Sequence, residues 1–383
     1  MLKREFNGFE ERPTLLGFGT MRLPVTGPDT MEIDEKEAEK LIDYAYENGI
    51  NYFDTAYGYH GGQSETFIGK ALSKFPRDSF YLASKMPSWM VETEADVPRI
   101  FEEQLKKCRV DYFDFYLVHN ITENKLNRIE NLKIHSFLKE MKAQGKIRHL
   151  GFSFHDTPEV LRQTIERFDW EFAQIQFNWF DWEQQRAKET YEILESNHLP
   201  TIVMEPLRGG ALVNLSPEAA QILEAANPYI SPAAWGLRFA ATLPNILCVL
   251  SGMSAMEQVQ ANIKTMDAFH PITNEEQKAL EQAVVAFRKS FPIPCTGCRY
   301  CTPCPMGVDI PRALAIFNHY QVKQQPFAFL QECNVLGAEK SPMRCVGCRK
   351  CEKVCPQKIE VSSWMRQLTS MIQTFEKPDW LKR

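Results

Sequence analysis

Eight of the 11 cysteines lie near the C-terminus in two short runs with regular spacing. The runs are CTGCRYCTPCP, from Cys295, and CVGCRKCEKVCP, from Cys345. Each has three cysteines at every third position and a further cysteine before proline. This spacing suits a [4Fe–4S] cube, whose fourth ligand comes from the other run in chains with two clusters. It predicts one cage from Cys295, Cys298, Cys301 and Cys355, and a second cage from Cys345, Cys348, Cys351 and Cys304.

A zinc site is the alternative interpretation of these cysteines. Tetrahedral zinc commonly takes two separated C-x2-C pairs, and three cysteines in succession, present twice, do not follow that pattern. The segment is also basic, although the net charge of the whole chain is −5. Its basic side chains would offset the negative charge of two cubes or form a face that docks an acidic electron-transfer protein. They are Arg299, Arg344, Arg349, Lys350, Lys353 and Lys358.

The C-terminal segment resembles the dicluster 4Fe–4S ferredoxin domains, in the helical form with a long insert between the two runs. It departs from their pattern because two residues rather than three separate Cys301 from Cys304, which shortens the reach of Cys304. The clusters would relay electrons to or from a partner protein, or they would stabilise a small helical domain. The other cysteines are expected to be small buried hydrophobic residues. They are Cys108, Cys248 and Cys333.

Upstream of the cysteines, polar residues follow three successive apolar runs. FDTAYGYHGGQSE contains Asp54 and Tyr59, ASKMP contains Lys85, and YLVHN contains His119. Reduction of a carbonyl by hydride needs a proton donor at the oxygen, and a phenol with an ordinary pKa of about 10 is a weak acid near neutrality. An adjacent ammonium stabilises the phenolate. Lys85, held by Asp54, would therefore activate Tyr59, and His119 would orient the substrate oxygen.

Apolar runs rich in β-branched and aromatic residues alternate with helical patterns along this part of the chain. The runs predict strands at 15–21, 50–55, 80–86, 113–120, 148–154, 172–179, 200–206 and 246–252. Eight strand–helix units predict an α/β fold, a closed parallel (β/α)8 TIM barrel, in which polar residues at the C-terminal strand ends share one active-site face. An open doubly wound sheet is the alternative, but RLPVTGPDT after the first strand lacks the Gly-rich loop of such folds.

The helical patterns also place the domain boundary. One helix is expected to begin after Ser64 as its N-cap, and the last amphipathic pattern of the barrel ends at residue 290. FPIP at 291–294 follows and predicts a boundary. The chain would thus comprise a barrel over 1–290 and a small, mainly helical iron–sulfur domain over 291–383.

The order of motifs in the barrel part resembles the aldo-keto reductase superfamily, over about Leu15 to Asn262. The motifs are LLGFGTM, FDTAYGYH with SE, ASK, YLVH, GFS and EPL. The resemblance implies hydride transfer between NAD(P)(H) and an aldehyde or ketone, or the reverse reaction on an alcohol. It implies Tyr59 as general acid/base, Lys85 and Asp54 as the residues that tune it, and His119 as the residue that orients the substrate. Tyr57 fits the motif spacing less well.

The resemblance also implies a set of cofactor-binding positions. The asparagine that commonly follows the family's serine is Phe154 here, and Met204 stands where an aromatic ring stacks on nicotinamide. Gly252 and Gln258 replace the Lys and Arg that bind the 2′-phosphate of NADP, so NAD(H) is expected to be preferred unless Arg208 substitutes. The full set is Gly19, Thr20, Met21, Asp54, Ser153, Gln174, Met204, Pro206, Leu207, Arg208, Ser251, Gly252, Gln258 and Asn262.

Length and composition bound the remaining possibilities. The 383 residues suit two domains, no apolar stretch is long enough for a membrane span, and the charged start predicts a cytoplasmic protein. The negative net charge argues against a nucleic-acid partner. A non-catalytic, NAD(P)-sensing subunit is the alternative to an enzyme. Trp89, Trp179 and Trp182 would line an aromatic pocket or belong to the core.

Overall fold

The computed structural model describes residues 1–27 and 30–375, and these form two compact units. The first unit comprises Met1–Leu207 and Ala233–Ile272. The second comprises Arg208–Pro232 and the chain from Thr273 onward. Two parts of the sequence interpreted above, residues 28–29 of RLPVTGPDT and residues 376–383 of the predicted iron–sulfur domain, lie outside the described residues.

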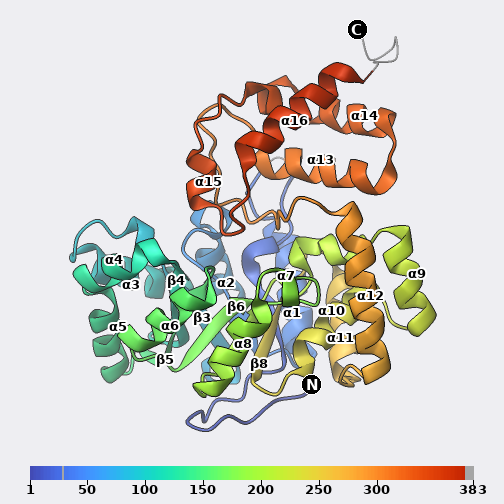
Figure 1. Ribbon diagram of the computed structural model, residues 1–383. Helices are drawn as coiled ribbons and strands as arrows, with labels where there is room; N and C mark the ends of the chain where they lie inside the picture. The colour runs from blue at the N-terminus through green and yellow to red at the C-terminus, as the bar shows by residue number, and fades with distance from the viewer. Residues whose placement is uncertain (28–29, 376–383) are drawn as a thin grey trace. The chain divides into compact units, whose positions relative to one another are not determined.

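Eight parallel strands of the first unit close into a barrel in sequence order (Figure 1). Each strand overlaps one of the eight predicted runs, which confirms the TIM barrel and excludes the open sheet. The strands are β1 (Leu16–Gly19), β2 (Tyr52–Asp54), β3 (Tyr81–Met86), β4 (Phe113–Ile121), β5 (Ile147–Phe154), β6 (Phe172–Gln176), β7 (Thr201–Met204) and β8 (Ile246–Gly252).

The segments between the strands form helices whose apolar residues recur on one face. In α3, for example, Val97, Ile100, Phe101 and Leu105 are buried, which is the spacing of a single helical stripe. The helices of this unit are α1 (Glu35–Glu47), α2 (Ser64–Leu72), α3 (Asp96–Cys108), α4 (Glu123–Asn131), α5 (Ile134–Ala143), α6 (Pro158–Arg167), α7 (Asp181–Gln184), α8 (Ala187–Ser196), α10 (Pro232–Thr242) and α11 (Met256–Asp267).

The prediction that Ser64 caps a helix is wrong. Helix α2 begins at Ser64 itself, and Gln63 occupies the N-cap position without a side-chain hydrogen bond. The Ser64 hydroxyl instead lies 2.7 Å from the Thr20 hydroxyl and 2.8 Å from the Thr55 hydroxyl, and all three are buried. Because buried hydroxyls need partners, this triad takes the serine that would otherwise cap the helix, and it ties α2 to the ends of β1 and β2.

The barrel interior is filled by large side chains opposite glycines. Tyr52, Phe115 and Phe172 belong to a buried cluster inside the barrel. A Cβ on Gly17 would lie 2.6 Å from the Cys248 sulfur, so glycine is needed for this close approach. Cys248 and Cys108 are both fully enclosed, which confirms that they are small buried hydrophobic residues.

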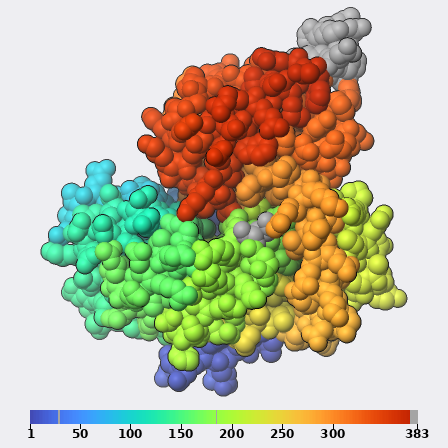
Figure 2. All heavy atoms as spheres, in the orientation of Figure 1, coloured from blue at the N-terminus to red at the C-terminus, as the bar shows by residue number. Residues whose placement is uncertain are grey.

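The second unit is mainly helical. Its helices are α9 (Pro217–Ala226), α12 (Asn274–Ser290), α13 (Ile310–Lys323), α14 (Pro326–Leu336), α15 (Lys350–Val354) and α16 (Val361–Thr374). Helices α9 and α12 pack side by side (Figure 2) and precede residue 291, so this unit takes in more sequence than the predicted cluster domain. No helix among the described residues has the length and apolar character that a membrane crossing requires.

The hydrophobic core of the second unit lies between α13, α14 and α16. Leu314, Phe317, Phe329 and Leu368 are buried in it. Cysteines of both runs pack against this core, and so does Cys333, which is only half-buried and so does not meet the prediction that it is buried. The cysteine runs are therefore part of the packing of this unit, not extensions from it.

Candidate active site and metal centres

Several predicted catalytic and cofactor residues of the barrel lie at the C-terminal ends of its strands, while Tyr59 begins the short helix η2 (Tyr59–Gly62) after β2, and Gln258 and Asn262 lie in α11. Asp54 ends β2, and Gly19 at the end of β1 is in register with both Asp54 and Gly252. Lys85 is the penultimate residue of β3, and His119 lies near the end of β4. Since all eight strands are parallel, these ends share one rim, which is the active-site face of such barrels.

A buried ammonium connects the predicted acid/base tyrosine to its carboxylate neighbour. The Lys85 Nζ lies 2.7 Å from each Asp54 carboxylate oxygen, 2.8 Å from the Thr55 carbonyl oxygen and 3.4 Å from the Tyr59 hydroxyl. An ammonium has three donors, and these three residues accept all of them. Lys85 is fully enclosed and Asp54 nearly so. The lysine is thus held in one position with a single N–H directed at the phenol.

Burial and pairing act in opposite directions on these two charges. Burial lowers the pKa of Lys85 and raises the pKa of Asp54, while the charge of each partner counteracts both shifts. Removing either partner would leave the other as an uncompensated buried charge, which is strongly destabilising. The pair therefore keeps an ammonium next to Tyr59 in a place where an isolated lysine would lose its proton.

His119 is positioned by an irregularity in β4. The register between β4 and β5 shifts between Val118 and Ile121, and Asn120 adopts a left-handed φ of 56°. Bulges of this kind redirect side chains next to active sites. The His119 ring lies edge-on to the Tyr59 ring, with 6.0 Å between centroids. Burial, followed by the nearby charges, holds the pKa of His119 well below its usual range, so the imidazole is neutral at pH 7.

A second network of buried hydrogen bonds connects β3 to α2, α3 and β4. The Ser84 hydroxyl donates to Glu65 over 2.6 Å, and the Gln104 amide donates to the same carboxylate over 2.5 Å and to the Lys85 carbonyl over 3.1 Å. The Tyr116 hydroxyl donates to Gln104. Burial raises the pKa of Glu65. The backbone of Lys85 is thus fixed by α2, α3 and β4 together.

Three predicted nicotinamide contacts come from β5, β6 and β7. The Ser153 hydroxyl accepts a hydrogen bond from the Asn120 N–H over 2.7 Å, so the serine also closes the β4 bulge. The Gln174 amide nitrogen lies 3.7 Å from the Met204 sulfur. Within the part of the chain that the structure describes, no hydrogen bond reaches the buried Gln174 Oε1 or the buried Asn120 Oδ1. Two such oxygens suit a carboxamide NH2 donor.

The other predicted cofactor residues divide into those with structural bonds and those on the rim. The Thr20 hydroxyl donates to the Asp54 carbonyl over 2.9 Å. The Asn262 amide donates to the Ser251 hydroxyl over 3.1 Å. Gln258 is exposed, and its side-chain oxygen accepts from the Ser254 N–H over 2.8 Å. Met21 and Leu207 are half-buried, and Pro206 is buried.

Arg208 belongs to the second unit, although the residues before it belong to the first. Its side chain is 1% exposed. The guanidinium donates to the Pro294 carbonyl over 3.3 Å and lies 5.6 Å from the centre of the Phe291 ring. These contacts give Arg208 a role in the packing of its own unit, beside the role in pyrophosphate binding that the sequence predicts.

Residues beyond the strand ends complete the surroundings of His119, and sequence reasoning did not single out two of them. The Trp89 ring lies 5.0 Å from the His119 ring. Lys125 and His155, which the sequence analysis missed, are close enough to His119 for their charges to lower its pKa. Trp182 packs against Phe177 and Phe239, and Trp179 is buried beside Phe180, whereas Trp89 contacts the ring of His119.

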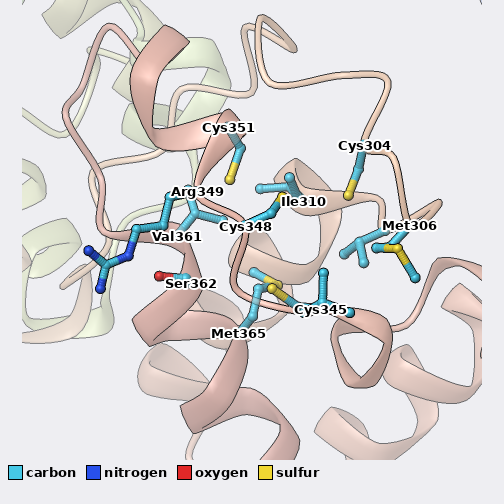
Figure 3. A pocket seen from close by; sticks show the side chains of 12 residues that line it. Cys304, Met306, Ile310, Cys345, Cys348, Arg349, Cys351, Val361, Ser362 and Met365 are labelled. Carbon is cyan, nitrogen blue, oxygen red and sulfur yellow. The ribbon is translucent and has the colours of Figure 1, made fainter.

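Four cysteines of the second unit line one small cavity. Cys345, Cys348 and Cys351 come from the second run, and Cys304 comes from the first (Figure 3). Their sulfur atoms point toward one another (Figure 3), and Val308, Ile310, Val361 and Met365 complete an apolar wall. This is the set that the spacing assigns to the second cage. The shorter Cys301–Cys304 interval does not keep Cys304 away from it.

The other four cysteines form a second group. Burial and the neighbouring thiols of Cys298, Cys295 and Cys355 raise the pKa of the Cys301 thiol to about 12. Because these three thiols act on the pKa of Cys301, they lie near it. The four cysteines are the combination that the spacing assigns to the first cage. Among the described residues, no three Cys, His, Asp or Glu side chains lie close enough to hold a single ion. A cube binds each thiolate at a different iron and so needs a wider arrangement than zinc does.

The two cysteine runs share a backbone conformation that the sequence analysis did not use. Both begin C-x-G-C-R. Gly297 and Gly347 have φ of 69° and 70°, and Arg299 and Arg349 have φ of 64° and 57°. Left-handed residues between right-handed ones turn successive N–H groups toward one side, where they stabilise anions. The shared C-x-G-C-R pattern was the available signal for two equivalent thiolate loops.

The basic side chains near the runs are largely engaged by acids. Arg299 lies 3.7 Å from Asp309, and Arg344 forms an ion pair with Glu339. Arg349 lies 3.9 Å from Glu352, and its guanidinium extends away from the sulfur atoms in Figure 3. These three arginines therefore contribute less to offsetting thiolate charge than their positions in the sequence predict.

Comparison with known families decides the classification of the barrel. The family model described as "Aldo/keto reductase family" matches residues 15–285. The chain belongs to the aldo-keto reductases. A second model, described as "4Fe-4S dicluster domain", matches residues 294–360 of the same reductase. Both resemblances drawn from the sequence are thereby confirmed, and the reductase is an NAD(P)-dependent oxidoreductase with an iron–sulfur domain.

Individual relatives cover the barrel part of this aldo-keto reductase. "Uncharacterized oxidoreductase YqkF" of Bacillus subtilis is 25% identical over 70% of this chain and 95% of its own. "NADH-specific methylglyoxal reductase" of Escherichia coli is 24% identical, with the same coverage of each chain. The structure of the aldo-keto reductase AKR11C1 from Bacillus halodurans is 26% identical, covers 74% of this chain and 96% of its own, and superimposes with a TM-score of 0.62.

His155 is expected to make the reductase sensitive to mild acid. Burial, followed by the charges of Lys125 and Lys85, lowers the pKa of His155 to about 3. Between pH 6.5 and that value the unfolded chain binds a proton at this histidine and the folded chain does not, so stability falls as pH falls. We expect the wild type to lose about 1 kcal/mol more free energy of unfolding than His155→Gln between about pH 6.5 and 5.5.

Urea unfolding at the two pH values, followed by tryptophan fluorescence, measures this difference. The exposed His198→Gln serves as the control for the loss of one histidine. Parallel pH profiles of the wild type and His155→Gln would contradict the expectation.

Proposed function

We propose that this aldo-keto reductase reduces an aldehyde or ketone to an alcohol, or catalyses the reverse reaction, with Tyr59 as the general acid/base. The observation that carries the proposal is the Lys85 ammonium, which lies 2.7 Å from the Asp54 carboxylate and 3.4 Å from the Tyr59 hydroxyl. A bound nicotinamide would supply the hydride. Tyr59 delivers the proton to the carbonyl oxygen, and Lys85 stabilises the phenolate that remains.

His119 has a separate task in this proposal. Because its imidazole is neutral, it donates a hydrogen bond to the substrate oxygen without competing with Tyr59 as an acid. The bulge in β4 and the Trp89 ring hold the imidazole in place. The carbonyl oxygen is then held between a phenol and an imidazole, and this orients its carbon for hydride transfer.

We propose that residues of β4, β5 and β6 hold the nicotinamide carboxamide. Gln174 Oε1 and Asn120 Oδ1 provide buried acceptors for its NH2 group, and the Ser153 hydroxyl is free to donate its proton while it accepts from Asn120. Asn120 would thus take the role of the asparagine that commonly follows the serine in the family, because Phe154 stands at that position here. The other predicted cofactor residues keep the roles that the family resemblance gives them.

A preference for NADH over NADPH is expected from the residues after β8. Gly252 has no side chain, and Gln258 is neutral and already bonded to Ser254. Arg22, beside Gly252, lies 3.9 Å from Glu205. A relative named as NADH-specific supports the same preference.

Fluorescence titrations should show weaker binding of NADPH than of NADH. Gln258→Arg should tighten NADPH binding about tenfold by a charge-assisted contact and leave NADH unchanged. Tighter binding of NADPH by the wild type would contradict this.

We also propose two [4Fe–4S] clusters, one in each group of four cysteines. The small cavity with four convergent thiols supports the second cage, and the mutual proximity of Cys295, Cys298, Cys301 and Cys355 supports the first. When bound, the clusters would supply one-electron redox chemistry. The two matched C-x-G-C-R loops would hold them in equivalent ways.

The second cage is better placed for exchange of electrons with another protein. Cys348 is exposed, and Met343, Val346 and Val354, which lie within six residues of it in the sequence, are 51%, 64% and 50% exposed. Lys350 and Lys353 lie in the adjoining helix α15. Exposed apolar side chains with nearby lysines suit the docking of an acidic electron-transfer protein. The alternative, purely structural clusters, predicts no change in their redox state during turnover.

One experiment tests the proposed reaction and the role of the clusters together. Protein purified without oxygen is mixed with [4,4-²H2]NADH and a panel of aldehydes and ketones, and separately with NAD+ and the corresponding alcohols. Deuterium in the product alcohol would demonstrate hydride transfer, and the absence of turnover with every compound would favour the NAD(P)-sensing alternative. Visible and EPR spectra of the same samples would show cluster reduction if the clusters relay electrons. The cytoplasmic location remains a prediction from the sequence.

A further inference from the structure

A half-buried lysine lies next to the predicted catalytic histidine. The Lys125 Nζ, on α4, donates to the Asn120 carbonyl over 2.7 Å and lies 5.1 Å from the centre of the Trp89 ring. The Trp89 ring lies 5.0 Å from the His119 ring. Trp89 therefore contacts Lys125 and His119 together, and Asn120 is the neighbour of His119 in the chain. An ammonium is thus one aromatic ring away from the group that would hold the substrate carbonyl.

Lys125 has no ion-pair partner among residues 1–27 and 30–375. An exposed lysine of the neighbouring helix α5 does have an ion-pair partner, since Lys139 pairs with Asp169. Burial lowers the pKa of Lys125 to about 8. In most molecules the Lys125 side chain is therefore still protonated at pH 7. A partly desolvated cation without a carboxylate is costly and gains from an anionic ligand.

The charged and titratable groups near Lys125 include cations, histidines and two carboxylates that other groups engage. Both Lys125 and Lys85 lower the pKa of His119 and of His155, so the two lysines and the two histidines share one electrostatic environment. The carboxylate of Asp54 is engaged by Lys85. The Asp156 carboxylate accepts backbone N–H groups of Glu123 and Thr157. Lys125 is therefore the cation of this group for which no carboxylate partner is found among the described residues.

The position of Trp89 is fixed from the same helix. Trp89 lies in the short helix η4 (Ser88–Met90), and Arg128 of α4 donates to the Ser88 carbonyl over 3.0 Å and to the Val91 carbonyl. The Arg128 guanidinium is thus hydrogen-bonded to the backbone of this segment. Lys125 is left as the cation of α4 that is directed at the site.

We propose that Lys125 binds a carboxylate of the substrate, so that the substrates of this reductase are carbonyl compounds that carry a carboxylate. The inference rests on the proposed function, because it places the substrate carbonyl at Tyr59 and His119. One ammonium balances one negative charge, which favours a carboxylate over a phosphate dianion. The face of Trp89 would cover the apolar part of the substrate between its two polar ends.

Two aldehydes that differ at the carboxyl group, charged in one and esterified in the other, test the inference. They are 4-formylbenzoate and its methyl ester. We expect the wild type to have the higher kcat/KM for 4-formylbenzoate. Lys125→Met, which keeps the length of the side chain, should lower kcat/KM for 4-formylbenzoate about 30-fold and leave the ester within about twofold. Lys125→Arg should retain most of the preference, and the exposed control Lys139→Met should change neither aldehyde.

A binding measurement separates this inference from the proposed reaction. Calorimetric titration of the protein with 4-(hydroxymethyl)benzoate should show binding that Lys125→Met weakens by a similar factor. If that binding depends on Lys125 but neither aldehyde is reduced, the proposed reaction fails and the carboxylate site stands. If both aldehydes are reduced and Lys125→Met affects them equally, the carboxylate site fails and the reaction stands. Competition by inorganic phosphate that exceeds competition by benzoate would also overturn the inference.

Discussion

Tyr59→Phe is expected to lower kcat for carbonyl reduction by about 10³ and to leave the affinity for NADH within about twofold. The substitution removes the hydroxyl that lies 3.4 Å from the Lys85 Nζ and keeps the ring that packs against His119. Without the hydroxyl, the acid that Lys85 is proposed to activate is missing. Steady-state kinetics with the best aldehyde of the panel, together with NADH titration, measure the two effects.

The neighbouring Tyr57 provides a matched control. Its hydroxyl donates to Glu103 over 3.1 Å, and the Lys107 ammonium lies 4.3 Å from its ring, so it belongs to the α3 side of the barrel. Tyr57→Phe should keep kcat within about threefold. Equal kcat for the wild type and Tyr59→Phe would exclude Tyr59 as the proton donor, and an equal loss in both variants would indicate damage to the fold.

Cys355→Ser is expected to lower the iron content from about eight to about four atoms per chain. Cys355 lies with Cys295, Cys298 and Cys301, so its loss removes one thiolate from the first cage and none from the second. Iron and sulfide analysis of protein purified without oxygen measures the content, and EPR of the reduced protein shows which cluster signal is lost. Cys304→Ser should remove the other signal, although Cys304 belongs to the first run.

Cys333→Ser is the control for these variants. Cys333 packs against the same core but belongs to neither group of four. It should retain about eight irons. Cysteines of both cages also pack against this core, so cluster loss should lower the melting temperature of the second unit. If Cys304→Ser and Cys355→Ser abolished the same signal, the crossed assignment of the fourth ligands would be wrong.

Much of the fold and of the candidate site was predictable because both depend on regular patterns. A strand needs β-branched and aromatic residues in a short run, and β1 to β8 each show such a run. Once the barrel was inferred, the strand-end rule placed Asp54, Lys85 and His119 on one rim. The cysteine spacing likewise fixed which sulfurs could meet, since C-x2-C-x2-C suits a single cube.

The remainder depends on contacts that no local pattern specifies. Lys125 and His155 lie beyond strand ends, on a helix and a loop whose return toward His119 is set by η4 and by Arg128. An amphipathic pattern shows that α9 and α12 have apolar faces but not that these faces cover each other. Ser64 could cap a helix or join buried hydroxyls, and only the packing of β1 and β2 decides between them.

The left-handed Asn120 limits where substrate preference can change during evolution. Its N–H binds Ser153, its carbonyl binds Lys125, and its neighbour is His119, so one residue is shared by three parts of the site. A substitution at Asn120 that disfavours this left-handed backbone would disturb all three at once and is expected to be rejected by selection. Trp89 also contacts the His119 ring, so exchange there would disturb the catalytic group. New specificities in descendants of this enzyme should therefore arise by exchange at Lys125, while the bulge stays the same.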